Sequence, residues 1–322
     1  MGCVIFSDIT TIVVDVHAFK SYRAYPCDVM TNRCDVQNRK LDTGFRLTRV
    51  GVTGVKKPVR IKRNGDIALI NDTLNCTIDV FVDLPAEQRG SHLSRNLEVL
   101  REIVDESVSS PVPGIEALAV SICRKLLDRH DYADTAEVLI VAEYFRNSKT
   151  PNGRDTLEIY TLIGEASAVR NEGLLKTIGV EVIGMTACPC AQETVGSALN
   201  CKGNVAVMTH NQRNICTVSM TMDETVNIEA NDLIDIVESS FSSPTYEILK
   251  RDDEAAVVIN AHNNPKFVED VVRDVLKRIV SRYSDLPDDV SLIVRSESEE
   301  SIHKHNAFAE RQTTLGDLRE CR

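Results

Sequence analysis

The order of its hydrophobic patterns is the feature that most constrains how this chain can fold. Strand patterns come first, over 45–55, 58–63 and 76–84, and two amphipathic helical patterns follow, over 94–108 and 114–130. Two further alternating segments, 136–145 and 156–169, flank a polar turn and so predict a hairpin. The first half therefore reads strand, strand, helix, helix, strand, strand, with Gly54 as a predicted bend or bulge.

The second half repeats this order. Strand patterns over 177–185 and 215–222 precede helical patterns over 231–240 and 263–283, and a strand pattern over 290–298 follows with a further strand after it. Antiparallel strands with helices inserted in pairs favour an α+β fold with the helices on one face of a sheet.

Length and composition set the organisation. The chain has 322 residues, 43% hydrophobic and 26% charged, enough for two domains. We assign 1–40 to an N-terminal extension, 41–170 to a first module and 171–322 to a second module that carries most of the chemistry. The net charge of −11 argues against a nucleic-acid partner or an anionic membrane surface.

The start of the chain and its cysteines indicate the compartment. The first 20 residues lack a basic start and contain Asp8 and Asp15, so they fit neither a signal peptide nor a membrane span. The ten cysteines are irregularly spaced, and Cys76, Cys123 and Cys216 lie in apolar runs, where a buried reduced thiol is expected. We therefore expect a cytoplasmic protein.

The segment 184–214 carries the clearest chemical signal. It places Cys188 and Cys190 on either side of Pro189, and His210 follows 22 residues after the first cysteine. Thiolate and imidazole ligands suit Fe²⁺ or Zn²⁺, and the proline stiffens what we expect to be a loop. Two ligands make only half a metal site, so the rest of the chain must supply the others.

Other candidate residues each have a simpler structural explanation. His210 could equally be a polar loop residue, and His303 and His305, which would share a face of a strand, could be a solvated pair. Glu254 ends an acidic cluster of the kind usually found in solvated turns. Glu269 lies near a helix start, where an acid contributes ~0.3–1 kcal/mol through the helix dipole. The common phosphate-binding loops and hydrolase motifs are missing from the sequence, so spacing alone predicts only a Cys/His/Glu metal enzyme.

Seven motifs add a resemblance. They are LTRVGVTGVKKPV (47–59), RGSHLSRNLEVL (89–100), GMTACPCAQE (184–193), THNQRN (209–214), YEILKRDDE (246–254), NPKFVEDVVRDV (264–275) and SIHKHNAFAE (301–310). With these motifs, which cover about residues 35–310 in the family's order, the sequence resembles the type IB GTP cyclohydrolase family. Within that family it resembles the archaeal branch that serves the methanopterin pathway, because the spacer between CPC and HNQR is longer and contains Cys201.

The resemblance implies a fold, an assembly and a metal site. The fold is two tandem tunnelling-fold modules, each an antiparallel four-stranded sheet with two helices, and the chains form a homodimer or homotetramer around a barrel. The metal is one Fe²⁺ per subunit, with Zn²⁺ or Mn²⁺ as substitutes, and its implied ligands are Cys188, His210, Glu254 and His303. Cys188, His210 and His303 are also the implied catalytic residues. Glu269 would bind the guanine edge by a bidentate contact, and Arg213 would also bind substrate.

The implied enzyme is a hydrolase of cyclic amidine C–N bonds. It would open the imidazole ring of GTP, release formate and pyrophosphate, and give 7,8-dihydroneopterin 2′,3′-cyclic phosphate, the first step of tetrahydromethanopterin biosynthesis. Metal-bound water with a pKa of ~7 would supply the nucleophile, and a histidine would move protons. Cations for the phosphates could come from Lys56, Lys57, Arg95, Arg213, Lys250 and Arg251.

Three alternatives remain open from the sequence. One is the bacterial-type enzyme, which leaves the triphosphate on dihydroneopterin. Another is a different tunnelling-fold pterin or deazapurine enzyme, such as a nitrile reductase that uses NADPH and a nucleophilic cysteine. The third is a structural zinc site in an assembly scaffold.

Overall fold

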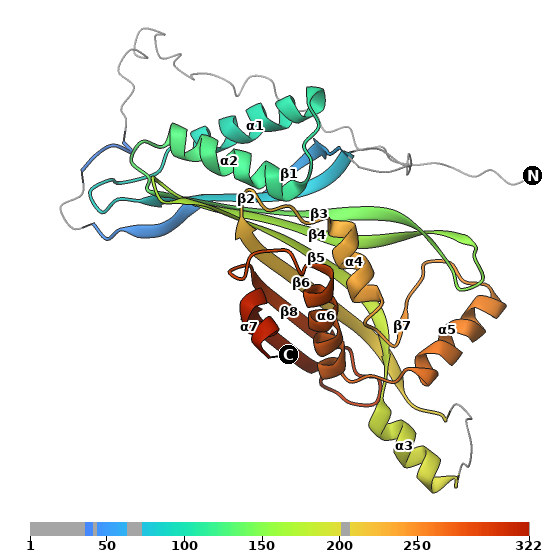
Figure 1. Ribbon diagram of the computed structural model, residues 1–322. Helices are drawn as coiled ribbons and strands as arrows, with labels where there is room; N and C mark the ends of the chain where they lie inside the picture. The colour runs from blue at the N-terminus through green and yellow to red at the C-terminus, as the bar shows by residue number, and fades with distance from the viewer. Residues whose placement is uncertain (1–35, 41–43, 63–72, 201–206, 322) are drawn as a thin grey trace, which may run out of the picture.

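A single antiparallel sheet forms the body of the chain (Figure 1). The computed structural model describes residues 36–40, 44–62, 73–200 and 207–321, so most of the predicted extension 1–40, and Cys201, lie outside the described residues. The sheet has nine strands in the order β1-β2-β3-β4-β5-β6-β8-β9, and β7 pairs with β5. The strands are β1 Leu47–Arg60, β2 Thr73–Leu84, β3 Thr135–Lys149, β4 Asp155–Val169, β5 Gly173–Ala187, β6 Asn211–Asp223, β7 Ser243–Pro244, β8 Ser291–Ser298 and β9 Ala307–Thr314.

The bulge at Gly54 and the hairpin over 136–169 are present as predicted, but the number of strands before β2 differs. The described residues of the first two strand patterns, 45–55 and 58–62, lie mostly in the single strand β1. Its register against β2 shifts between Val52 and Val55, and Gly54 has φ of +70°, so the glycine is a bulge, as predicted. The hairpin of β3 and β4 is also confirmed, with register running from Thr135↔Val169 to Lys149↔Asp155.

The helices pack on one face of the sheet. In the first half α1 (Leu93–Ser109) and α2 (Ile115–Arg129) match the two predicted helices, and α2 packs on β3, β4 and β5. In the second half α4 (Ala230–Glu238) packs on β5 and α6 (Val268–Arg282) on β8 and β9. Their apolar stripes meet even-numbered residues of the central strands, such as Tyr160, Val180 and Met220, in one continuous core.

The opposite face of the sheet is open. Odd-numbered residues of β3, β4, β5 and β8 and even-numbered residues of β9 point there, because the strand register alternates faces. Large apolar side chains are exposed on this face: Phe145, Ile159, Leu175, Ile183, Ile293 and Phe308.

The two halves have the predicted order of elements. The first half is β1, β2, α1, α2, β3, β4, and the second contains β5, β6, α4, α6, β8, β9 with α3, β7, α5 and α7 added. The three added helices are α3 Pro189–Ala198, α5 Arg251–Asn263 and α7 Leu315–Glu320. The α+β class and the antiparallel sheet are therefore confirmed. The division at 170/171 falls in the turn between β4 and β5, which pair with each other, and the tandem modules stay a prediction.

Candidate active site

Cys188 lies where β5 ends and α3 begins, and Figure 1 shows α3 projecting from that end of the sheet. The segment predicted as a stiff loop is therefore a strand–helix junction, with Pro189 in the first turn of the helix, where its fixed φ suits the fold. The Sγ of Cys188 is the N-cap acceptor and receives the backbone N–H of Ala191 at 3.4 Å.

His210 comes next to Cys188 because β5 and β6 are paired. Ala187 lies opposite Asn211, and the backbone N–H of Cys188 donates to the carbonyl of His210 at 3.1 Å. Thr209 Oγ1 donates to the carbonyl of Cys188 at 2.7 Å. The 22 residues between Cys188 and His210 therefore connect two neighbouring strands. The first two predicted ligands, Cys188 and His210, lie side by side at the end of these strands.

Two residues that sequence reasoning missed contact the His210 side chain. Its Nδ1 lies 3.0 Å from Oε1 of Gln212 and 3.7 Å from Oε2 of Glu300. Both partners are largely buried, and Oε2 of Glu300 has no hydrogen-bond partner among the described residues. Gln212 belongs to the HNQR motif and Glu300 precedes the SIHKHN motif. The only sequence signal for these two residues was therefore their position close to a candidate histidine.

His303 and His305 lie side by side, but not on a strand. The segment 301–305 is an irregular connection between β8 and β9, and both side chains are exposed there. Their rings stack with centroids 5.2 Å apart and an interplanar angle of 14°. The prediction of a strand was wrong because β8 ends at Ser298, although the two rings still meet.

Glu254 lies on α5, not in a solvated turn. Its neighbour Asp253 is fully buried and anchors the first turn of α5 to the β3–β4 hairpin, where it accepts from Asn152 and pairs with Arg154. Glu254 itself is exposed. The other end of α5 reaches the cysteine segment, since Gln192 Nε2 donates to the carbonyl of His262 at 2.7 Å. Eight residues of helix, about 12 Å, separate Glu254 from that contact.

The two predicted substrate residues lie on different sides of this end of the sheet. Glu269 is exposed in the first turn of α6, and the backbone N–H of Lys266, just before that helix, donates to the carbonyl of Ala187 at 2.9 Å. Arg213 alternates with Gln212 along β6, so it faces the open side of the sheet, with Nη1 3.8 Å from Glu299 Oε2. Glu269 therefore lies near the junction of β5 and α3 that carries Cys188. Arg213 lies on the opposite, open face of the sheet.

The four predicted metal ligands are not assembled within this chain. Among the described residues, no three His, Cys, Asp or Glu side chains group closely enough to hold an ion. Cys188, His210 and His303 all come from the same end of β5, β6 and β8, and Glu254 comes from α5. The ligand set stays a prediction.

The candidate phosphate-binding residues are spread over the chain. Lys56 and Lys57 are on β1 and Arg95 is on α1, in the first half. Arg95 Nη1 already donates to the carbonyl of Arg129 at 2.9 Å. Lys250 and Arg251 are at the start of α5, close to Glu254.

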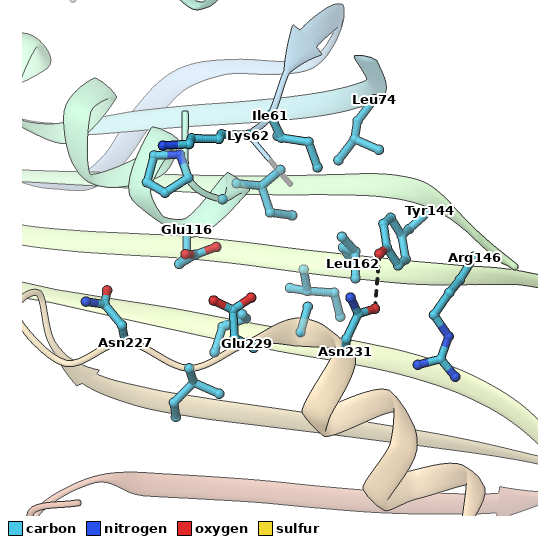
Figure 2. A pocket seen from close by; sticks show the side chains of 17 residues that line it. Ile61, Lys62, Leu74, Glu116, Tyr144, Arg146, Leu162, Asn227, Glu229 and Asn231 are labelled. Atoms are coloured by element: carbon cyan, nitrogen blue, oxygen red, sulfur yellow. Dashed lines mark hydrogen bonds between the residues drawn. The ribbon is translucent and has the colours of Figure 1, made fainter. Parts of the chain in front are cut away.

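A cavity of about 350 Å³ lies elsewhere, where the first turns of α2 and α4 meet over β4 and β5 (Figure 2). Glu116 and Glu229 direct their carboxylates into it, and burial raises the pKa of Glu116. Tyr144 Oη donates to Asn231 Oδ1 at 3.0 Å across its wall. None of the predicted site residues lines this cavity.

The comparison with protein families shows to which family the chain belongs. The type I GTP cyclohydrolase (folE2) family model matches residues 34–309, close to the predicted range of 35–310. The chain belongs to the type I GTP cyclohydrolase family. The predicted family and the predicted enzyme class are thereby confirmed.

Individual family members match over nearly their full length. The chain is 44% identical over 301 residues to GTP cyclohydrolase MptA 1 of Methanocella arvoryzae, covering 88% of this chain and 95% of that protein. It is 41% identical over 309 residues to GTP cyclohydrolase MptA of Methanocaldococcus jannaschii, covering 90% and 98%. Among solved structures, uricase from Arthrobacter globiformis aligns with a TM-score of 0.48 and 6% identity, covering 83% of this chain and 93% of that one.

Among the described residues, no helix has both the length and the hydropathy needed to cross a membrane.

Proposed function

We propose that this family member hydrolyses GTP, opening the guanine imidazole ring with loss of formate and pyrophosphate. The product would be 7,8-dihydroneopterin 2′,3′-cyclic phosphate, the first intermediate of tetrahydromethanopterin biosynthesis. The observation that carries the proposal is the 41–44% identity to proteins named GTP cyclohydrolase MptA over at least 95% of their length. The range that the family model matches, residues 34–309, contains every proposed site residue.

We further propose that the reaction depends on a divalent metal ion, Fe²⁺ first, held by Cys188, His210, Glu254 and His303. The chemistry of the donors fits such an ion. Cys188 Sγ acts as an acceptor, and Oε2 of Glu300 is a buried acceptor without a hydrogen-bond partner in the described part of the chain. A bound ion would supply Lewis-acid chemistry and lower the pKa of its water to ~7.

The chain's own residues would bind and orient the substrate. The carboxylate of Glu269 would accept hydrogen bonds from the ring N–H and exocyclic amine of guanine, which selects that base. His305, stacked on His303 and exposed, would pass a proton to the leaving ring nitrogen. Lys250 and Arg251, beside Glu254, are the basic candidates that α5 carries toward the phosphates.

The assembly is part of the proposal. We take 41–170 and 171–322 as two tunnelling-fold modules, preceded by the extension 1–40, and the repeated order of elements supports this division. β1 and β9 are edge strands of the described sheet, and its open face exposes large apolar side chains. Such edges and faces suit pairing with further copies, as a homodimer or homotetramer. Glu254 could join the other ligands through such pairing.

The cysteines support a cytoplasmic location. The six cysteines in the part of the chain that the structure describes are all free thiols. Cys76, Cys123 and Cys216 are buried thiols, as predicted, and burial raises the pKa of each to about 12. Free thiols are typical of a reducing compartment.

Anaerobic incubation of the reduced protein with GTP and Fe²⁺, followed by mass analysis, tests the function. We expect formate, pyrophosphate and the cyclic phosphate. Dihydroneopterin triphosphate would correct the product while keeping the ring opening. Full activity in His210→Asn or His303→Asn would refute the assigned site, and no formate from GTP would refute the function.

A further inference from the structure

The side-chain amide of Gln212 lies between His210 and Glu300. Its Oε1 is 3.0 Å from Nδ1 of His210, and its Nε2 is 3.3 Å from Oε1 of Glu300 and 3.2 Å from Oγ1 of Thr186. Gln212 is only 9% exposed, so protein groups and not solvent determine which way its amide points.

Glu300 decides the orientation of this amide. Nε2 of Gln212 donates both to Oε1 of Glu300 and to Oγ1 of Thr186. If the amide were turned over, Oε1 of Gln212 would face Oε1 of Glu300, and two acceptors would meet in a buried place. The amide therefore presents its NH₂ group to Glu300 and its oxygen to His210.

The orientation of the amide in turn decides the tautomer of His210. An amide oxygen next to Nδ1 can only accept, so Nδ1 must carry the proton, and a second acceptor, Oε2 of Glu300, lies 3.7 Å away on the same side. The other ring nitrogen, Nε2, then has a free lone pair, and within the described residues nothing hydrogen-bonds to it.

A buried chain of polar groups holds Gln212 in place. Thr186 Oγ1 accepts from Gln212, so its own proton is available to Ser298 Oγ, 3.1 Å away. Asn214 Nδ2 also donates to Ser298 Oγ at 2.7 Å, and Ser296 Oγ donates to Asn214 Oδ1 at 2.9 Å. These groups come from β5, β6 and β8, so three strands fix the one amide.

We propose that Glu300, acting through Gln212, holds His210 as the Nδ1-protonated tautomer and so makes Nε2 the nitrogen available to a metal ion. Only the role toward the metal rests on the proposed function. Both residues are positioning residues, since they act through His210, and an unprotonated imidazole nitrogen is the form that binds metals.

Nitrogen NMR of the metal-free, full-length protein tests the tautomer directly. Long-range proton–nitrogen spectra distinguish protonated from unprotonated ring nitrogens, and the His210 signals are identified by their loss in His210→Asn. We expect a protonated Nδ1 and an unprotonated Nε2 in the unsubstituted protein. In Glu300→Gln the new amide can accept as well as donate, so both nitrogen signals should move to averaged positions. Gln212→Met, which keeps the side-chain length, should do the same.

Glu299→Gln is the matched control. It removes one carboxylate at the adjacent position, where the side chain lies by Arg213, and should leave the His210 signals unchanged. A second measurement is the affinity for Co²⁺, which we expect Glu300→Gln to weaken about 10–100-fold.

Two results would overturn the proposal: an Nε2-protonated His210 in the unsubstituted protein, or an unchanged tautomer in folded Glu300→Gln. The first result decides the matter even where a variant fails to fold. If the tautomer behaves as expected but the protein opens no guanine ring, the proposed function fails and this assignment stands.

Discussion

The backbone N–H of Cys188 donates to the carbonyl oxygen of His210 at 3.1 Å. This hydrogen bond joins two residues that are 22 positions apart in the sequence, and it extends the β5–β6 ladder by one step beyond Ala187 and Asn211. The two backbones are therefore fixed by a sheet and by the first turn of α3, which would give the proposed site a rigid base.

Cys188→Ser should abolish Fe²⁺ binding by the reduced protein. Serine can still cap α3, so the fold should persist while the thiolate is lost. We expect a loss of affinity greater than the about 10–100-fold that outer partners of a ligand contribute. Anaerobic titration with Fe²⁺ measures it, and Cys321→Ser, at an exposed cysteine, is the control. Unchanged affinity in Cys188→Ser would remove this residue from the ligand set.

Gly184→Ala should destabilise the strand that leads to Cys188. A Cβ at Gly184 would overlap the ring of Phe241, which is fully buried, so the core must shift at a cost of about 1–3 kcal/mol. Urea denaturation measures this. The double variant with Phe241→Leu should recover part of the loss. Gly196→Ala, in α3 with room for a methyl group, should be neutral or slightly stabilising.

His130 should make the protein less stable in mild acid. It is fully buried between Asn96 and Tyr132, and burial, with nearby Arg95 and His92, lowers its pKa to about 4. The unfolded chain takes up this proton near pH ~6.5 and the folded one does not, so stability falls as the pH drops from there toward the folded pKa, by at most about 1.4 kcal/mol per pH unit. Denaturant unfolding at several pH values should show a smaller slope in His130→Gln than in the unsubstituted protein. An equal slope in both would contradict the assignment; His305→Gln, at an exposed histidine, should keep the original slope.

Asp253→Asn should lower the melting temperature by several degrees. Although burial acts to raise it, hydrogen bonds from Thr150, the Lys250 backbone, Asn152 and Arg154 hold the pKa of Asp253 well below its ordinary value. Its contribution to stability is therefore present above about pH 4 and is lost as the pH falls below that. Thermal unfolding at pH 7 and pH 3 checks this, since the variant should differ from the unsubstituted protein at pH 7 and less at pH 3. Asp155→Asn, at an exposed carboxylate, should change little at either pH.

Periodicity predicted the regular elements well, because each buries one face. The pattern over 94–108 gave α1, and the alternation over 136–169 gave the β3–β4 hairpin. It failed where burial does not decide the structure. α5 has no clear apolar stripe, since only Asp253, Val257 and Ala261 are buried, and its acidic first turn resembled a solvated turn. The first turn of α5 is anchored by the contacts of Asp253 with Asn152 and Arg154. These two partners lie 101 and 99 residues away from Asp253 in the sequence, so no local pattern predicts the anchor.

The candidate site was predictable in part. The motifs located Cys188 and His210, but Gln212 and Glu300 are recognisable only once β6 and β8 are paired, because their contact depends on that register. The stacking of His303 on His305 likewise arises from an irregular connection whose path no periodicity describes.

The pairing of β4 with β5 has a consequence for how the protein unfolds. The ladder from Thr161↔Glu181 to Val169↔Gly173 joins the halves of the chain, and α2 of the first half also packs on β5 of the second. Neither half can open without breaking hydrogen bonds and core contacts of the other, so their transitions are coupled. Denaturation should then occur in one cooperative step, and a substitution near β1 should be felt at the cysteine end of β5 as a change in global stability.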